Sequence, residues 1–319
     1  MEITSNIAIG DWYRNTTSND LLYWGLDYPP LTAYHSYLFG LCANTINPSM
    51  VALKSSRGYE SSEEKIFMRS TVQISDIIIF VPAILFLVEN LKTSASQRVD
   101  NQNLKGRVQR FLVSLFCLLQ PGLLIIDHGH FQYNGVCIGF ALLAAYAMSE
   151  GKDVVASVLF CLSLNFKQMS LYYALIFFSA LLRKCFDSSD RMLFQIWQVT
   201  KLGFAVIVTF ACLWAPFCVL HSTDETCLSS LLHVLHRQFP FSRGIFEDKV
   251  SNIWYSISVL FDLRQVMSTQ QLVLCSFLLT LALTLPVCCN LLLNRFDLKR
   301  FLIAMMNGSL AFFLASYQV

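Results

Sequence analysis

Three clusters of polar and aromatic residues have the composition of a substrate-binding surface. The first, residues 24–35, contains Asp27, Tyr28 and His35 on a backbone that Pro29 and Pro30 restrict. Aromatic faces beside a few fixed polar groups suit a sugar, whose ring has one apolar face and many hydroxyl groups. We therefore take Asp27, Tyr28 and His35 as candidate substrate-binding residues. The alternative is an aromatic belt at a membrane interface, which needs no ligand.

The second cluster, residues 127–134, joins two apolar stretches with more polar side chains than a simple turn requires. Its candidate substrate-binding residues are Asp127, His128, His130, Gln132, Tyr133 and Asn134. Binding of a sugar or a phosphate group is the main hypothesis, and a plain hydrophilic turn is the alternative. A His-x-His pattern with one carboxylate is weak evidence for a metal site. The sequence thus predicts no metal and no other cofactor.

The third cluster, residues 237–249, lies in the long polar segment 221–270. Arg243 suits bidentate contact with phosphate, but it could equally pair with Glu247 and Asp248 and pin the segment. These three residues are also candidate site residues.

Two further charges, Asp76 and Lys167, lie within or between apolar stretches. An ionisable group inside a bilayer costs at least about 2.5 kcal/mol, so each of the two residues is a functional candidate. For Lys167 the candidate role is binding of a lipid phosphate. The alternative for Lys167 is that its ammonium group extends to the membrane surface.

The elements that carry these clusters are apolar. Of 319 residues, 55% are hydrophobic and 14% are charged, and the mean hydropathy is +0.52. A soluble domain has roughly 25% charged residues. The composition therefore predicts a polytopic membrane protein, and it is all-α because the alternating pattern of a membrane barrel is missing. We expect spans at about 71–91, 111–126, 135–149, 154–164, 169–182, 202–220, 271–293 and 301–319.

Two of these spans, 154–164 and 169–182, are too short to cross a bilayer unless they are tilted or re-entrant. Residues 31–53 are apolar but interrupted by polar residues, so we expect an interfacial or loop helix there.

Charges in the connecting segments predict which face of the membrane the clusters occupy. Taken together, segments 92–110, 150–153, 183–201 and 294–300 contain more Lys and Arg than acidic residues, whereas acidic residues prevail in 1–70, 127–134, 165–168 and 221–270. An excess of Lys and Arg marks the cytoplasmic side. We therefore expect a luminal loop with interfacial helices at 1–70, followed by a transmembrane bundle at 71–319 that includes a long luminal loop at 221–270.

Three smaller features of the sequence concern glycosylation, net charge and cysteines. Asn15, in Asn15-Thr16-Thr17, lies in the first luminal segment and is a candidate for N-glycosylation. The net charge of +2 provides no basic surface for nucleic acid. The 11 cysteines lie mostly in apolar stretches and form no Cys-x-x-Cys pair, so we expect buried thiols that pack as small hydrophobic groups.

Five strings spread over most of the chain carry a family resemblance. They are Trp24 to Ser36 (WGLDYPPLTAYHS), Ser56 to Glu60 (SRGYE), Asp127 to Asn134 (DHGHFQYN), Leu164 to Met169 (LNFKQM) and Arg243 to Val250 (RGIFEDKV). The chain resembles the dolichyl-phosphate-glucose-dependent α-1,3-glucosyltransferases of the N-glycosylation pathway. Gly25, Leu31 and His35-Ser36 resemble the branch that adds the first glucose to the lipid-linked oligosaccharide. The branch that adds the second glucose has bulkier, more aromatic residues at these places.

The resemblance implies a many-helix membrane bundle of the GT-C type with luminal loop helices that form the active site. It implies dolichyl phosphate glucose as the donor, a lipid-linked high-mannose oligosaccharide as the acceptor, and a single inverting displacement in the endoplasmic reticulum (ER) membrane. It also adds Arg57, from the second string, to the candidate substrate-binding residues. The phosphate leaving group would need cations or hydrogen-bond donors, and a carboxylate would activate the acceptor hydroxyl.

Relative to the family pattern, the chain begins after the first span and after the acidic luminal motif that supplies the catalytic base. It ends before a His-Glu-Lys motif and further spans. We therefore expect a chain truncated at both ends, inactive on its own, with Asp27 as the nearest substitute for the base. The alternatives are the enzyme that adds the second glucose and a non-catalytic pseudoenzyme or assembly factor. A transporter is a third, although the sequence shows no inverted repeats.

Overall fold

The computed structural model describes residues 1–91, 104–188, 191–220, 225–239 and 252–316, and every regular element within these ranges is helical. Five helices are long and apolar enough to cross a membrane: Ser62–Asn90, Gln168–Asp187, Met192–Val219, Thr269–Leu293 and Leu298–Ala315. A sixth candidate is the pair Gly106–Leu118 and Pro121–His130, which is bent by 44°. The all-α prediction is confirmed for this part of the chain, which has the helices of a multi-pass membrane protein.

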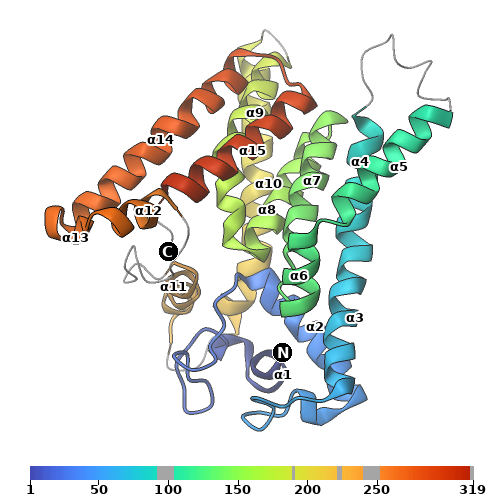
Figure 1. Cartoon of the computed structure of the whole chain (residues 1–319), viewed down its shortest axis with the longest axis vertical. Helices are drawn as coiled ribbons and strands as arrows, with labels where there is room; N and C mark the ends of the chain where they lie inside the picture. Colours follow the sequence, from blue (N-terminus) through green and yellow to red (C-terminus); the bar gives the residue numbers. More distant parts are fainter. Residues whose placement is uncertain (92–103, 189–190, 221–224, 240–251, 317–319) are drawn as a thin grey trace. The chain divides into compact units, whose positions relative to one another are not determined.

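The first candidate span is one helix with an irregular turn in its middle (Figure 1). It comprises α3 (Ser62–Ser75), the π-helical turn η3 (Asp76–Phe80) and α4 (Val81–Asn90). Ser61 caps it by accepting a hydrogen bond from the Glu64 backbone N–H at 3.0 Å, so the helix begins well before the predicted start at residue 71. Pro82 has no N–H to bond to the preceding turn, and the helix widens there into the π-turn.

The predicted span at 111–126 corresponds to the bent helix pair, which Pro121 divides. Helix α5 (Leu104–Leu118) ends just before Gln120, which is extended, and Pro121 is the first residue of α6 (Pro121–His130). Proline has no N–H to bond to the preceding turn of a helix, and it fits the first position of a new helix. The resulting bend redirects the segment that ends in the second polar cluster.

The chain divides into two compact units. Unit 1 contains Met1–Ser170 and Leu202–Gln238. In it, α7 (Asn134–Ser149) packs along α8 (Asp153–Phe166), and η3 and α4 pack on α7. Small buried residues of α7, including Ala141, Ala144 and Ala145, allow this close approach. Helices α7 and α8 have 16 and 14 residues, fewer than the ~20 that usually cross a bilayer.

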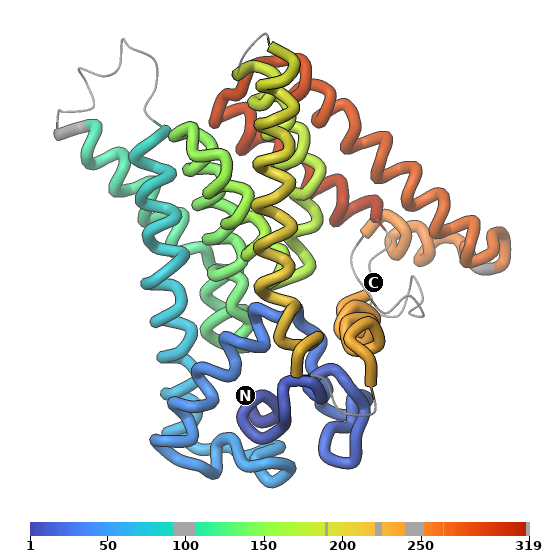
Figure 2. Tube along the Cα trace, turned by 180° about the vertical axis from the view of Figure 1, so that it is seen from behind, coloured from blue at the N-terminus to red at the C-terminus, as the bar shows by residue number. Residues whose placement is uncertain are grey.

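The N-terminal segment of unit 1 packs on the end of α10 (Met192–Val219) and on α11 (Cys227–Gln238) (Figure 2). It contains α1 (Glu2–Asn6), η1 (Ile9–Asp11), α2 (Pro30–Ile46) and η2 (Pro48–Met50). Their shared core consists of Ile3, Trp12, Tyr13, Ala33, Phe217 and Val234. Helix α2 occupies most of the segment 31–53 that we expected to be helical, and its location at an interface stays a prediction.

Unit 2 contains Leu171–Lys201 and Phe239–Val319. Helix α9 (Ala174–Asp187), which follows the 3-10 helix η6 (Gln168–Tyr173), packs against α14 (Thr269–Leu293) and α15 (Leu298–Ala315). Two short helices, α12 (Ile253–Leu260) and α13 (Leu263–Val266), precede α14. Ser268 and Gln271 form a capping box at the start of α14, which fixes that end of the helix.

Candidate functional site

The turn between α6 and α7 has a strained backbone. Phe131 and Tyr133 have φ values of 58° and 54°, in the left-handed region that favours glycine. For a residue with a side chain this conformation costs roughly 1–2 kcal/mol, and such strain is concentrated at functional sites. The turn brings Asn134, the first residue of α7, back beside the last turn of α6.

Asp127 is enclosed at this turn. It is only 1% exposed, and its carboxylate accepts hydrogen bonds from Asn134 Nδ2 at 2.8 Å and from the backbone N–H of Gly135 at 2.7 Å. The N-terminal end of a helix favours a negative charge, and Asp127 faces the first turn of α7. The carboxylate therefore has partners within the protein instead of reaching out from a surface turn.

Lys167 contacts the same amide from the other side. It is 4% exposed, and its ammonium group donates to Asn134 Oδ1 at 2.8 Å and to Gln132 Oε1 at 3.2 Å. Burial lowers the pKa of Lys167, whereas the negative charge of Asp127 acts in the opposite direction and favours the ammonium form. Asn134 thus connects a buried cation to a buried carboxylate, an arrangement that we call the Lys167–Asn134–Asp127 bridge.

Tyr28 closes the bridge from the N-terminal segment. Its hydroxyl donates to Gln132 Oε1 at 3.1 Å, and the Lys167 ammonium lies 5.3 Å from the centre of its ring. Such a cation over an aromatic face is attracted by the ring's electron density. Burial raises the pKa of Tyr28, so its hydroxyl remains a donor at neutral pH.

His35 and Tyr133 form a neutral wall of the site. Ser75 donates its hydroxyl hydrogen to the Thr71 carbonyl, so the His35 Nε2–H donates to Ser75 Oγ, at 2.9 Å. Burial lowers the pKa of His35 to about 4. The centres of the His35 and Tyr133 rings lie 4.7 Å apart. His35 is therefore an uncharged hydrogen-bonding group at neutral pH and no cation for a phosphate.

A second charged pair lies beside the bridge. His128 Nε2 is 3.1 Å from Asp76 Oδ2, so the one acidic residue of η3 meets the last turn of α6. Gly135 makes this possible, because a Cβ atom there would lie 2.3 Å from Asp76 Oδ1. Within the part of the chain that the structure describes, Asp76 Oδ1 is buried and accepts no hydrogen bond.

The other predicted site residues lie elsewhere or cannot be placed. Asp27 pairs with Arg237 at 2.5 Å, and Arg57 pairs with Glu2 at 3.0 Å. His130 is exposed, as is Asn15 in its loop. Arg243, Glu247 and Asp248 fall in 240–251, outside the described residues. The described ranges contain no group of three or more His, Cys, Asp or Glu side chains that could hold a metal ion, and metal independence stays a prediction.

Sequence reasoning missed two features close to these residues. Arg237, the first residue of the third cluster, donates to the backbone carbonyls of Leu21 and Leu26, and no sequence signal marks that pairing. Cys218 and Cys227 form a disulfide, which corrects the expectation that the cysteines are thiols with a packing role. The available signal was their position on either side of a short polar segment, with Cys218 near the end of the predicted span 202–220 and Cys227 in the predicted luminal loop 221–270.

The described residues have the helices of a multi-pass membrane protein and a buried cluster of charged side chains where helix ends meet. The chain belongs to the ALG6, ALG8 glycosyltransferase family, which matches it over residues 1–319.

Curated relatives match the whole chain. It is 44% identical over 319 residues to the dolichyl pyrophosphate Man9GlcNAc2 alpha-1,3-glucosyltransferase of Gallus gallus, covering 100% of this chain and 59% of that protein. It is 42% identical over 326 residues to the protein of the same name from Saccharomyces cerevisiae, covering 55% of it. It is 45% identical over 319 residues to a protein of Arabidopsis thaliana described as a probable enzyme of this name, covering 56% of that protein. The chain thus spans a little under three fifths of the length of these relatives.

Proposed function

We propose that the protein represented by this chain transfers glucose from dolichyl phosphate glucose to the high-mannose dolichyl-diphosphate oligosaccharide. The new bond is an α-1,3 linkage formed with inversion, on a GT-C bundle whose luminal loop helices form the site, during N-linked glycosylation in the ER membrane. Membership of a glycosyltransferase family and the names of the relatives support the reaction class. The site residues support the roles assigned below.

The observation that carries the proposal is the position of the Lys167 ammonium. It brings together three of the strings that resemble the family, through Tyr28, Gln132, Asn134 and Lys167 itself. A lysine has three N–H donors, of which two are used by these amides within the described residues. A cation held in place by neutral partners in a water-poor site strongly stabilises negative charge that develops on a leaving phosphate.

In the proposed reaction an acceptor hydroxyl oxygen attacks C1 of glucose while the bond from C1 to the phosphate oxygen breaks. The electron pair of that bond leaves with dolichyl phosphate, and the hydroxyl proton passes to a carboxylate base. Asp127 is occupied by two donors and Asp27 by Arg237, so neither is well suited to that task. We therefore assign the base to neither residue, and the inactivity expected of the isolated chain stays a prediction.

A disulfide and the contacts around it support the luminal placement of the N-terminal segment. The Cys218–Cys227 bond connects the end of α10 to the start of α11, and disulfides persist in oxidising compartments such as the ER lumen. Arg14 contacts Glu225 at 3.5 Å and Asp27 contacts Arg237, so residues 11–27 share that side of the protein. This agrees with the charge bias of the connecting segments.

The test is complementation of yeast cells that lack the enzyme adding the first glucose. The protein is expressed at natural length and as the 319-residue chain, and glucosylated lipid-linked oligosaccharide is scored. We expect the natural-length protein to restore the first glucose and Lys167→Met to abolish it. Activity of the solubilised enzyme should survive EDTA, because protein cations stabilise the phosphate.

Several results would contradict the proposal. Rescue only of cells that lack the second glucosyltransferase would assign the protein to that branch. No rescue in either strain would favour a non-catalytic protein. Loss of activity in EDTA that one divalent ion restores would support Asp127, His128 and His130 as metal ligands. Rescue by the 319-residue chain alone would refute its expected inactivity.

A further inference from the structure

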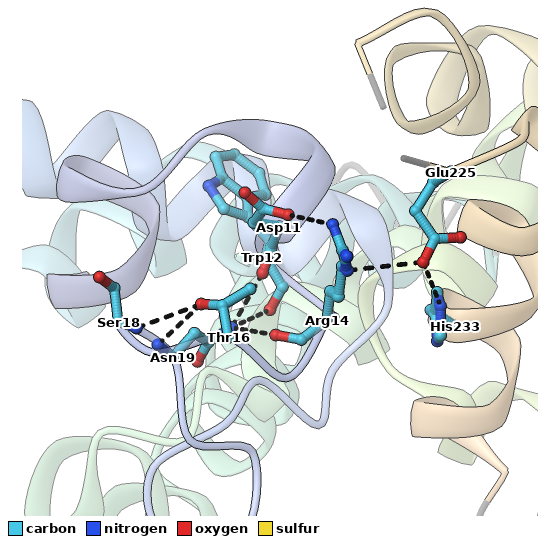
Figure 3. A network of polar contacts seen from close by, with 8 residues as sticks. All are labelled: Asp11, Trp12, Arg14, Thr16, Ser18, Asn19, Glu225 and His233. Carbon is cyan, nitrogen blue, oxygen red and sulfur yellow. Dashed lines mark hydrogen bonds and ion pairs between the residues drawn. The ribbon is translucent and has the colours of Figure 1, made fainter. Parts of the chain in front are cut away.

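Helix α11 contacts the N-terminal segment at both of its ends. Just before its start, Glu225 Oε1 lies 3.5 Å from Arg14 Nε and 3.5 Å from Nε2 of His233, which is in α11 (Figure 3). At its far end, Arg237 Nη2 donates to the Leu21 carbonyl at 2.7 Å and Arg237 Nε donates to the Leu26 carbonyl at 3.0 Å. The two contacts fix the orientation of α11 across residues 11–27.

The middle of α11 is anchored by apolar packing. Val234 is 1% exposed and belongs to a cluster with Trp12, Tyr13 and Phe217. Phe217 immediately precedes Cys218, and its ring lies 5.4 Å from that of Tyr13. The end of α10, the N-terminal segment and α11 therefore share one core at the disulfide.

The backbone of residues 21–27 is shaped around the Arg237 guanidinium. A Cβ at Gly25 would lie 2.9 Å from Arg237 Nη2 and 2.6 Å from the Leu21 Cα, so only glycine permits this approach. Arg237 also pairs with Asp27 at 2.5 Å. Two carbonyls and one carboxylate occupy a planar group with five donors, which suits a fixed structural contact better than exchange with a substrate.

This segment leads directly into the proposed site. Tyr28 follows Asp27; its carbonyl accepts a hydrogen bond from the Tyr13 hydroxyl at 2.7 Å, and its own hydroxyl donates to Gln132. Movement of residues 21–27 would therefore move the ring that faces Lys167.

The disulfide fixes the element that holds this segment. Helix α11 has only 12 residues, and isolated helices of that length are marginal, so its placement depends on tertiary anchors. The Cys218–Cys227 bond attaches its first residue to α10, with Cα atoms 4.3 Å apart. A covalent link removes alternative placements that noncovalent contacts alone would leave open.

We propose that the Cys218–Cys227 disulfide and α11 form a clamp that holds residues 21–28 in the substrate site, with Arg237 as its positioning residue. The clamp closes when the two thiols give two electrons and two protons to a protein disulfide oxidant, by thiol–disulfide exchange that leaves the oxidant as a dithiol. Its consequence for substrate affinity, which rests on the proposed function, is that the oxidised protein binds dolichyl phosphate glucose more tightly than the reduced protein does.

The test uses the natural-length protein in lipid nanodiscs. Amide hydrogen exchange is measured over residues 21–28 for wild type, Cys218→Ser, Cys227→Ser, Arg237→Ala and Arg237→Lys. Cys212→Ser is the matched control, because Cys212 is an exposed free cysteine on the same helix α10. We expect exchange to accelerate at least about tenfold in both cysteine variants and in Arg237→Ala, with Arg237→Lys intermediate and Cys212→Ser unchanged.

Dithiothreitol provides a second route if the variants do not accumulate. It should accelerate exchange in wild type as the serine substitutions do, and should have no further effect on Cys218→Ser. In the transfer assay, the clamp variants should raise the donor KM by roughly tenfold with kcat within about twofold, whereas loss of folded protein would lower only the apparent kcat.

Unchanged exchange over residues 21–28 in both cysteine variants would overturn the clamp, as would maleimide labelling of both thiols in protein taken directly from cells. Faster exchange with an unchanged KM would overturn the positioning role. If wild type transfers no glucose, the proposed function fails, and the exchange experiment still decides whether the clamp exists.

Discussion

The Lys167–Asn134–Asp127 bridge predicts a strong coupling between two buried charges. In Lys167→Met the carboxylate of Asp127, which is 1% exposed, loses the cation that faces it through Asn134. Removing one member of a buried pair costs about 3–5 kcal/mol, because the other charge is left in a low-dielectric site. For a chain of 319 residues that corresponds to a drop of about 5–7 °C in the midpoint of thermal unfolding.

A double-mutant cycle separates this coupling from the loss of packing. Lys167→Met, Asp127→Asn and the combined variant are purified in detergent, and unfolding is followed by a thiol-reactive dye or by tryptophan fluorescence. The combined variant should be more stable than the sum of the single effects implies, with an interaction energy of at least about 1 kcal/mol. Lys152→Met, at an exposed lysine in the turn between α7 and α8, is the control and should change stability by less than about 0.5 kcal/mol.

The refuting result is additivity. If the two single changes add within about 0.5 kcal/mol, the ammonium and the carboxylate are independent and the bridge carries no electrostatic coupling. A small loss in Lys167→Met together with a large loss in Asp127→Asn would have a different meaning. It would show that the α7 backbone and Asn134 alone stabilise the carboxylate.

Three further predictions each concern one residue. Gly135→Ala should destabilise the protein by about 1–3 kcal/mol, because the new Cβ would lie 2.3 Å from Asp76 Oδ1. The control is Gly203→Ala, where the added Cβ meets no neighbouring atom within 4 Å, and equal melting temperatures of the two variants would contradict the prediction. Burial lowers the pKa of His35 to about 4, so the unfolded chain takes up a proton at a higher pH than the folded protein does. The free energy of unfolding should therefore fall by up to about 3 kcal/mol as the pH drops from about 6.5 to 4. Unfolding measured over a pH series should show a smaller loss in His35→Gln, and identical pH profiles for the two proteins would refute the prediction. Exposed Asn15 should carry a glycan that endoglycosidase removes and that Asn15→Gln and Thr17→Ala abolish. The second sequon, Asn307-Gly308-Ser309, lies inside α15 and should stay unmodified. A reporter tag fused before α2 that is found in the cytosol would contradict the luminal assignment.

Hydrophobic length made the helical class predictable from sequence, but not the ends of the helices. The first span begins at Ser62 and not at 71, because Ser61 caps a polar first turn that a hydropathy reading excludes. Pro121 was visible in the sequence, yet its effect depends on whether the helix bends through it or restarts. Both differences arise because local backbone chemistry decides where a hydrophobic run becomes a helix.

The candidate site was predictable in its residue types and not in its partners. Tyr28, Asp127 and Lys167 were candidates from sequence, and the structure brings them together through Gln132 and Asn134. Asp76 stood out as an intramembrane charge, but nothing in the sequence pairs it with His128. The pairing depends on Gly135 lacking a side chain at the crossing, and such a steric condition is set by tertiary structure.

The pairing of Asp76 with His128 also affects how the protein enters the membrane. The chain is synthesised from its N-terminus, so the helix Ser62–Asn90 leaves the ribosome before α6 exists. A lone aspartate near the centre of a membrane helix costs about 2.5–3.5 kcal/mol, and that cost remains until its partner arrives. We therefore expect this helix to insert fully only together with α6, so that synthesis stopped before Pro121 leaves it less completely inserted than in an Asp76→Leu variant. Two residues that meet in the finished site would then also set the order in which the helices of unit 1 are integrated.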